Sequence, residues 1–189
     1  MARSAPQLSS SPPALPRQAR ARETFERLVA AAQEILERGG IEALNSNAVS
    51  AEAGTTPPTF YRYFNHKHDL LAELGRRLMN AQNAIIEQRA EGAVSREAYS
   101  EQGIEAVLLE TLAATRAFHG GRAITSALRA IPVLAPIRLD SHAHMADLMT
   151  RRLAPGLRGK APRGVYARAR LAVELGYAAI EMLLEVPEL

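Results

Sequence analysis

Apolar residues three or four positions apart recur along most of this chain, and this spacing limits its possible folds more than any other feature. Such spacing puts apolar side chains on one face of a helix, whereas a half-buried strand needs strict alternation. Alanine and leucine dominate the composition and β-branched runs are few, which also favours helix over sheet. The sequence therefore predicts an all-α fold.

Composition excludes several classes of chemistry. The chain has no cysteine, so disulfides, thiolate metal sites and cysteine nucleophiles cannot occur. No run of 18 apolar residues is present, and a membrane span is not expected. The net charge of +3 permits a nucleic-acid partner without requiring one. No Ser/His/Asp order, Gly-rich phosphate loop or metal motif stands out, so we expect no enzyme activity, no cofactor and no metal.

Residues 1–19 are predicted to be a disordered basic tail. The first 16 residues contain four prolines and four serines without periodicity, and Glu23 is the first acid after four arginines. A secretory signal would need an apolar core segment, which is missing. A transit peptide stays an alternative that the proline cluster opposes. Such a tail either adds phosphate contacts to a neighbouring domain or is a solvated leader.

Residues 20–66 have the spacing of a helix-turn-helix domain. A first amphipathic helix starts near Arg20 and stops at Gly39-Gly40. Ser46 and Asn47 are expected to cap a short second helix. Gly54 can turn the chain because it tolerates positive φ.

The third helix is predicted to run from Pro57 to Phe64, with Thr56 as its N-cap. Pro57 falls at the first helical position, where a missing N–H costs little. Phe60 and Phe64, four residues apart, mark the buried side of this helix.

These residues resemble the DNA-binding domain of the tetracycline-repressor (TetR) family over about residues 20–74. The segments that carry the resemblance are Asn45-Ser46-Asn47-Ala48-Val49, Ala53-Gly54-Thr55-Thr56, Thr59-Phe60-Tyr61-Arg62-Tyr63-Phe64, Lys67 and Leu70-Leu71. The rest of the chain is similar to that family only in being helical.

The resemblance implies that the third helix enters the major groove of DNA. It implies base contacts from the tip of that helix, with Asn47 contributing from the second helix, and phosphate contacts from hydroxyls and Lys67. The DNA-binding residues expected on these grounds are Ser46, Asn47, Thr56, Pro57, Pro58, Thr59, Tyr61, Tyr63 and Lys67.

The residues on either side of Lys67 depart from the family pattern. His66 stands where a capping Ser, Asn or Asp is common, and His68 where Glu is common. Asn65 or Asp69 is therefore expected to supply the hydrogen bonds at the start of the fourth helix. The two histidines are two positions apart and cannot share a helical face, which opposes a metal pair.

Residues 67–189 are predicted to form a helical ligand-binding and dimerisation domain. The fourth helix is expected to bury a heptad-like seam of Leu71, Leu74, Leu78, Ala81 and Ile85. Further helices are predicted around Ile104–Phe118, Ile124–Ile131 and Ile137–Leu153, and the last over residues 164–186.

A regulator of this family would bind a small molecule among the C-terminal helices, and its last helices would pair two subunits. Polar or adaptable side chains on apolar faces are the ligand candidates: Phe118, His119, Arg122, His142, Met145, Met149 and Tyr177. Small and apolar residues of the last helix are the candidate dimer surface: Ala172, Gly176, Ala179, Ile180 and Leu183. A tightly packed helix within one chain is the alternative reading of that stripe.

The sequence thus predicts a ligand-responsive transcriptional regulator, most simply a repressor. It would bind a palindromic double-stranded DNA operator as a homodimer and be released by a small-molecule effector. Its expected location is cytoplasmic, at the nucleoid, with no membrane partner. A helical protein–protein adaptor without operator binding is the competing hypothesis.

Overall fold

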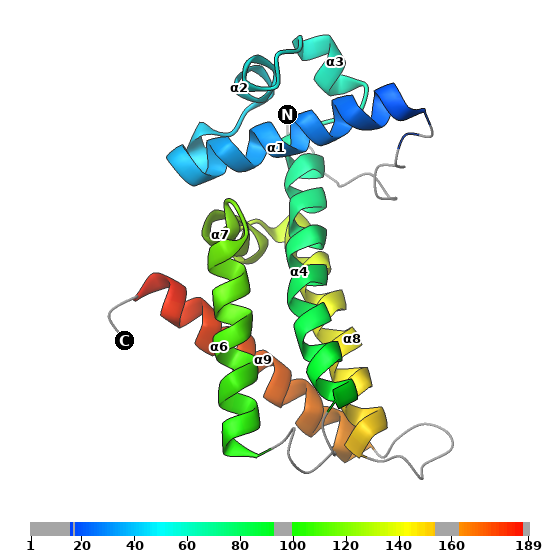
Figure 1. The fold of residues 1–189 in the computed structure, drawn as a ribbon, viewed down its shortest axis with the longest axis vertical. Helices are drawn as coiled ribbons and strands as arrows, with labels where there is room; N and C mark the ends of the chain where they lie inside the picture. Colours follow the sequence, from blue (N-terminus) through cyan, green and yellow to red (C-terminus); the bar gives the residue numbers. More distant parts are fainter. Residues whose placement is uncertain (1–15, 17, 93–99, 154–162, 187–189) are drawn as a thin grey trace, which may run out of the picture. The chain divides into compact units, whose positions relative to one another are not determined.

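The computed structural model describes residues 16, 18–92, 100–153 and 163–186, and within these ranges every regular element is helical (Figure 1). The elements are α1 (Ala19–Ala43), α2 (Ser46–Glu52), α3 (Pro57–Tyr61), α4 (Lys67–Gly92), α6 (Glu101–Ala117), α7 (Gly121–Ala130), the 3-10 helix η1 (Pro132–Leu134), α8 (Ala135–Leu153) and α9 (Arg163–Glu185). The predicted all-α fold is confirmed. Most of the predicted tail, residues 1–19, lies outside the described residues.

The chain forms two compact units. The first comprises Met1–Leu78 and Phe118–Ile137, and the second comprises Met79–Ala117 and Arg138–Leu189. Helix α4 contributes its first half to one unit and its second half to the other. No helix in the described ranges combines the length and apolarity needed to cross a bilayer.

An aromatic cluster forms the core of the first unit, in which α1 packs against α2 and α7, and α2 against α3 (Figure 1). The Phe25 and Phe64 rings stack with centroids 5.2 Å apart, and Phe60 lies 5.5 Å from Phe64. All three side chains are 1% exposed. Each aromatic pair contributes about 0.5–1.5 kcal/mol beyond its area burial. Phe60 and Phe64 are therefore core residues, as predicted.

The helix boundaries agree with the predicted glycine positions, but the cap of α2 and the end of α3 differ from the prediction. Gly40 has φ 64° and breaks the helical geometry of α1, as expected. Asn45, rather than Ser46 or Asn47, caps α2: its backbone is extended and its Oδ1 accepts a hydrogen bond from the N–H of Ala48 at 2.9 Å. Ser46 and Asn47 already have helical geometry, which removes them from the cap position.

The third helix is shorter than predicted. It ends at Tyr61, and the chain then turns with the Tyr63 N–H donating to the carbonyl of Phe60 at 3.0 Å. This turn lets Phe64 stack on Phe25 in the core. Packing of one aromatic ring thus decides an end that local spacing placed three residues later.

The buried face of α4 drifts away from the predicted heptad seam. Leu71, Leu74 and Leu78 are buried, but Ala81 is exposed and the next buried position is Gln82. A straight α-helix has 3.6 residues per turn, so a seam repeating every 3.5 residues rotates out of the core along the helix. The drift places polar residues of α4 inside the second unit.

The second unit has its core where α6 packs against α9 (Figure 1). Leu112, Tyr177, Ile180 and Leu184 form this cluster, and Leu108, Val173 and Leu183 pack around it. Helix α8 begins at Ala135, so Pro136 lies in its first turn, where proline is tolerated.

Candidate nucleic-acid interface and helical cavity

The turn between α2 and α3 fixes the two short helices against each other. Gly54 has φ 62°, a left-handed conformation that costs glycine little. The Thr55 N–H donates to the Ser50 carbonyl at 2.8 Å and closes the turn. Thr56 is extended and precedes Pro57 at the first helical position, as predicted. The fixed φ of Pro57 therefore suits the first turn of α3, although the Thr56 side chain makes no capping hydrogen bond.

The predicted DNA-binding residues all lie at the surface of the first unit. Asn47, Thr56 and Pro58 are exposed, and Tyr61 is 55% exposed. The others are partly exposed: Ser46, Pro57, Thr59, Tyr63 and Lys67. None of these nine residues is buried.

Hydrogen bonds bring these side chains together in two pairs. The Ser46 hydroxyl lies 3.0 Å from the Tyr61 hydroxyl and links the start of α2 to the end of α3. The Thr56 and Thr59 hydroxyls are 3.2 Å apart at the tip of α3. Each hydroxyl has both a donor and an acceptor function, so each pair keeps hydrogen-bonding capacity for a base edge or a phosphate.

The start of α4 presents a cation beside a carboxylate cap. The Asp69 carboxylate accepts a hydrogen bond from the Asn65 N–H at 2.9 Å, which confirms Asp69 in the expected capping role. The Lys67 ammonium donates to the Leu44 carbonyl at 3.4 Å and has further N–H donors free to meet a phosphate. Burial lowers the pKa of His68, and the charge of Lys67 adds to this shift.

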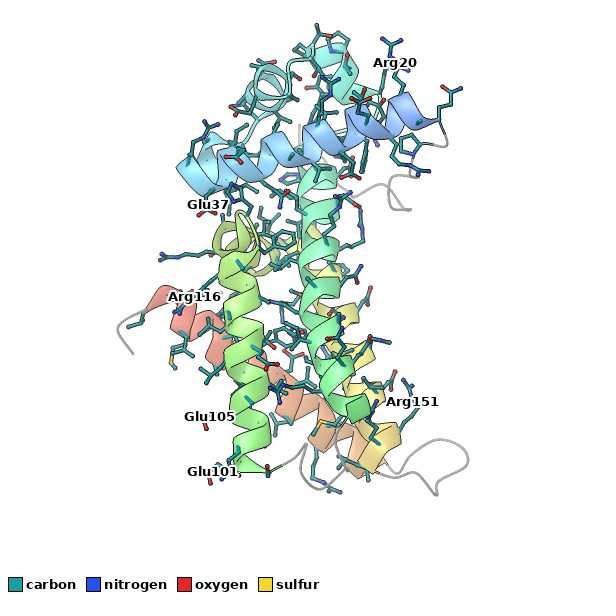
Figure 2. All side chains as sticks on the ribbon, in the orientation of Figure 1. Arg20, Glu37, Glu101, Glu105, Arg116 and Arg151 are labelled. Carbon is teal, nitrogen blue, oxygen red and sulfur yellow. The ribbon has the colours of Figure 1, made fainter. Side chains whose placement is uncertain are left out.

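Three further arginines add positive charge to the surface of the first unit. Arg62 is exposed at the C-cap of α3, and Arg20 and Arg22 are exposed at the start of α1. Figure 2 shows Arg20 projecting outward from that end of α1. The arginine-rich composition before Phe25 was the available signal, but it did not indicate which side chains share the surface.

An apolar cavity of about 640 Å³ lies in the second unit, lined from α4, α6, α8 and α9. Three predicted ligand residues line it: Met145, Met149 and Tyr177. Ile104 and Leu175 also line it and are 49% and 62% exposed, so the cavity opens to solvent. Its volume falls within the range of about 300–1,000 Å³ that is typical of small-molecule sites.

The other predicted ligand residues do not line this cavity. His142 is buried and stacks on Tyr177 with ring centroids 4.0 Å apart. Phe118, His119 and Arg122 belong to the first unit, where the His119 imidazole lies 2.9 Å from the Glu34 carboxylate. The sequence showed that these side chains lie on apolar helix faces, but it could not show which of the two units each one belongs to.

The residues expected at a dimer surface mostly face this cavity. Ala172, Gly176, Ala179 and Ile180 are among its lining residues, and Leu183 packs around the core cluster. A Cβ built on Gly176 would lie 3.5 Å from Leu108 Cδ2 of α6. A Cβ at that distance is in ordinary van der Waals contact, so Gly176 of α9 packs beside α6 within the chain.

A buried polar layer, which the sequence analysis did not assign to the site, lies beside the cavity. The Gln82 amide donates to the Thr115 hydroxyl at 2.7 Å. Asn83 Oδ1 accepts hydrogen bonds from the Ser141 hydroxyl at 3.1 Å and from the Tyr177 hydroxyl at 3.2 Å. Burial raises the pKa of Tyr177 to about 12, so its phenol stays protonated and donates. The polar residues Gln82 and Asn83, which follow the apolar positions of α4, are the feature of the sequence that could have indicated this layer.

Burial also shifts the pKa of His142, which lies beside this polar layer. His142 Nδ1 lies 3.0 Å from the Glu174 carboxylate. Burial lowers the pKa of His142, and the Glu174 carboxylate opposes that shift. The Arg138 and Arg170 guanidinium groups form ion pairs with the same carboxylate at 3.5 and 2.6 Å. Glu174 therefore interacts with three basic side chains, His142, Arg138 and Arg170.

Comparison with known proteins agrees with this arrangement. Residues 28–74 match the family described as bacterial regulatory proteins, tetR family. A fatty acid degradation regulator, FadR, from Bacillus halodurans has a similar fold, with a TM-score of 0.61 at 19% identity over 85% of this chain and 82% of that chain. A transcriptional regulator from Rhodococcus sp. Rha1 gives 0.61 at 18% identity, covering 86% of this chain and 84% of that one. A TetR-family transcriptional regulator from Mesorhizobium loti gives 0.54 at 16% identity, covering 86% and 98%. No curated protein matches the sequence significantly.

A helix-turn-helix tip with exposed hydroxyls, followed by α4 and an all-helical second unit, is an arrangement typical of DNA-binding transcriptional regulators. Residues 28–74, in the N-terminal domain, match the tetR family of bacterial regulatory proteins.

Proposed function

We propose that this protein is a ligand-responsive regulator that binds a palindromic operator as a homodimer and is released by a small molecule. The observation that carries the proposal is the pairing of an accessible α3 tip with an apolar cavity in which α4 takes part. Repression of a nearby promoter is the simplest consequence. The DNA partner implies action in the cytoplasm, at the nucleoid.

The roles of the interface residues follow from their chemistry. Pro57, Pro58 and Thr59 at the tip of α3 would meet base edges, where methyl and hydroxyl groups distinguish base pairs. Asn47 would add a base contact from α2. Tyr61 and Lys67, with their hydroxyl and ammonium donors, would clamp the phosphate backbone, and Ser46, Thr56 and Tyr63 would extend these contacts.

The exposed face of α9 is the best-supported dimer surface. Leu171, Leu175, Ala178 and Met182 are all exposed and are spaced four, three and four residues apart. This is the spacing of a coiled-coil seam, which two subunits can bury against each other. The seam lies beside the predicted stripe of Ala172, Gly176 and Ala179 rather than on it.

Helix α4 would carry the ligand signal. Its residues Ile86 and Arg89 line the cavity, and Asn83 accepts the hydroxyl of the cavity residue Tyr177. The same helix starts at Lys67, in the unit that contains α3. We assume two conformations that differ in the position of α4, of which one binds the operator and the other does not. A ligand that prefers the second conformation would weaken operator binding, at most by the ratio of its affinities for the two conformations.

Selection of bound fragments from a random DNA pool tests this function. We expect a palindrome whose half-sites are centred about 34 Å apart, one duplex turn, because a two-fold dimer presents two α3 helices. Pro58→Ala should alter the selected bases, whereas Ala30→Ser, exposed on α1, is a matched surface control. Tight binding to a protein partner with no DNA enrichment at low salt would favour the adaptor, and turnover of a substrate would favour an enzyme.

A further inference from the structure

The wall of the cavity in the second unit offers little hydrogen bonding to a ligand. Its two buried hydroxyls are already committed: the Thr111 hydroxyl donates to the Val107 carbonyl at 2.7 Å, and the Tyr177 hydroxyl donates to Asn83. Most other lining residues are aliphatic or methionine. A ligand that fills this space must therefore present an apolar body, since a buried polar group without a partner is costly.

Two arginines are the charged residues of the lining, and they differ in pairing. The Arg89 guanidinium is bound through two nitrogens by the Glu110 carboxylate, which neutralises its charge. Arg152, near the end of α8, is partly exposed, and no carboxylate lies within ion-pair distance of it in the described ranges. Among the described residues, the cavity thus joins an apolar interior to one positive charge that no carboxylate pairs with.

We propose that this cavity binds an amphipathic acid whose apolar body fills the space between α6, α8 and α9 and whose anionic headgroup pairs with Arg152. The inference deepens the proposed function, on which its regulatory meaning rests, by naming the chemical class of the effector. An Arg guanidinium suits this role because its fork of N–H donors matches a carboxylate.

The proposal predicts a dependence of affinity on both ends of the ligand. Each methylene moved from water into the cavity strengthens binding about fourfold, until the space is filled. A carboxylate beside Arg152 adds a charge-assisted hydrogen bond that an alcohol of equal length cannot match. A cationic headgroup of equal length is repelled.

Titration calorimetry with decanoate, decanol and decyltrimethylammonium, without DNA, tests these expectations. For the unaltered protein we expect one site per chain, with decanoate bound at least about tenfold more tightly than decanol and the cation bound most weakly. Arg152→Gln should bring decanoate to the affinity of decanol and leave decanol within about twofold. Arg151→Gln is the matched control, because Arg151 is exposed, lies outside the lining and points away from the helices in Figure 2.

A second pair of variants tests the location of the apolar body. Ala179→Leu extends a lining side chain into the cavity and should weaken decanoate and decanol alike, by about tenfold or more. Ala167→Leu, on an exposed part of α9 outside the lining, should leave both affinities unchanged. If Ala179→Leu does not fold, the comparison of the Arg151 and Arg152 variants still decides the proposal.

Two results would overturn the inference: equal affinity for the three headgroups, or equal effects of the Arg151 and Arg152 substitutions. A selected palindrome together with no decanoate binding would refute the effector class and leave the proposed function standing. Saturable decanoate binding that depends on Arg152, with no DNA enrichment, would refute the proposed function and support this site.

Discussion

The hydrogen bonds to Asn83 give a quantitative test of the buried polar layer. Asn83→Ala removes the acceptor of two hydroxyl donors, Ser141 and Tyr177, which are 9% and 7% exposed. Each buried donor left without a partner costs about 1–3 kcal/mol, so the loss from two is about 2–4 kcal/mol after some rescue by water. Alanine returns about 0.5 kcal/mol through its higher helix propensity. The free energy of unfolding should therefore fall by about 1.5–3.5 kcal/mol.

Urea unfolding followed by far-UV circular dichroism measures this loss. Asn80→Ala is the matched control, because Asn80 lies on the same helix but is exposed, and its effect should stay within about 0.5 kcal/mol. Tyr177→Phe completes a double-mutant cycle: with the phenol hydroxyl gone, Asn83→Ala should cost about 1 kcal/mol less than it does alone. Additive losses, or equal losses for Asn80→Ala and Asn83→Ala, would refute the reasoning.

Four further outcomes are expected. Lys67→Ala should weaken binding to all DNA sequences alike and lower the salt slope by about one; an unchanged slope removes Lys67 from the phosphate contacts. Thr59→Val should change base preference in repeated selections while the salt slope stays constant, and a uniform loss would contradict a base contact. Leu175→Glu should give monomers in light scattering, because a charge is added to the exposed seam of α9; retained dimers would exclude that seam. Burial lowers the pKa of His142 below 6.5, so the unfolded chain takes up its proton first and stability should fall as pH drops below about 6.5. His142→Gln should reduce that slope in urea titrations, leaving the part due to His68, whose pKa is lowered too; an unchanged slope would show that His142 does not titrate in this range.

Local chemistry made the N-terminal domain predictable. Gly54 tolerates the positive φ that the turn requires, and Pro57 fits the first turn of a helix. Phe60 and Phe64 are four residues apart, which is the spacing of one buried helix face. Each of these signals depends on a few neighbouring residues. One exception was the cap of α2, because Asn45, Ser46 and Asn47 are all good capping residues and only the backbone distinguishes them. The other was the end of α3 at Tyr61, which depends on the packing of Phe64 against Phe25.

The arrangement of side chains in the second unit could not be predicted from the sequence, because it depends on contacts between segments that are far apart in the chain. The small residues of α9 fit a second subunit or α6 equally well, and the approach of Gly176 to Leu108 was needed to show the contact within the chain. Likewise, His119 and His142 look equivalent in sequence, but only the fold puts the first beside Glu34 and the second against Tyr177.

By itself, the sequence determined that the chain is helical and where the turn of its helix-turn-helix lies, and it predicted a set of DNA-contact residues that lie at the surface. These properties follow from periodicity and backbone preference, which act over a few residues. The tertiary structure alone decided that Gln82 and Asn83 are buried, that Met145 and Met149 share a cavity, and that Arg152 lies in the lining of that cavity. Those facts depend on how helices far apart in the chain pack together, which no local pattern encodes.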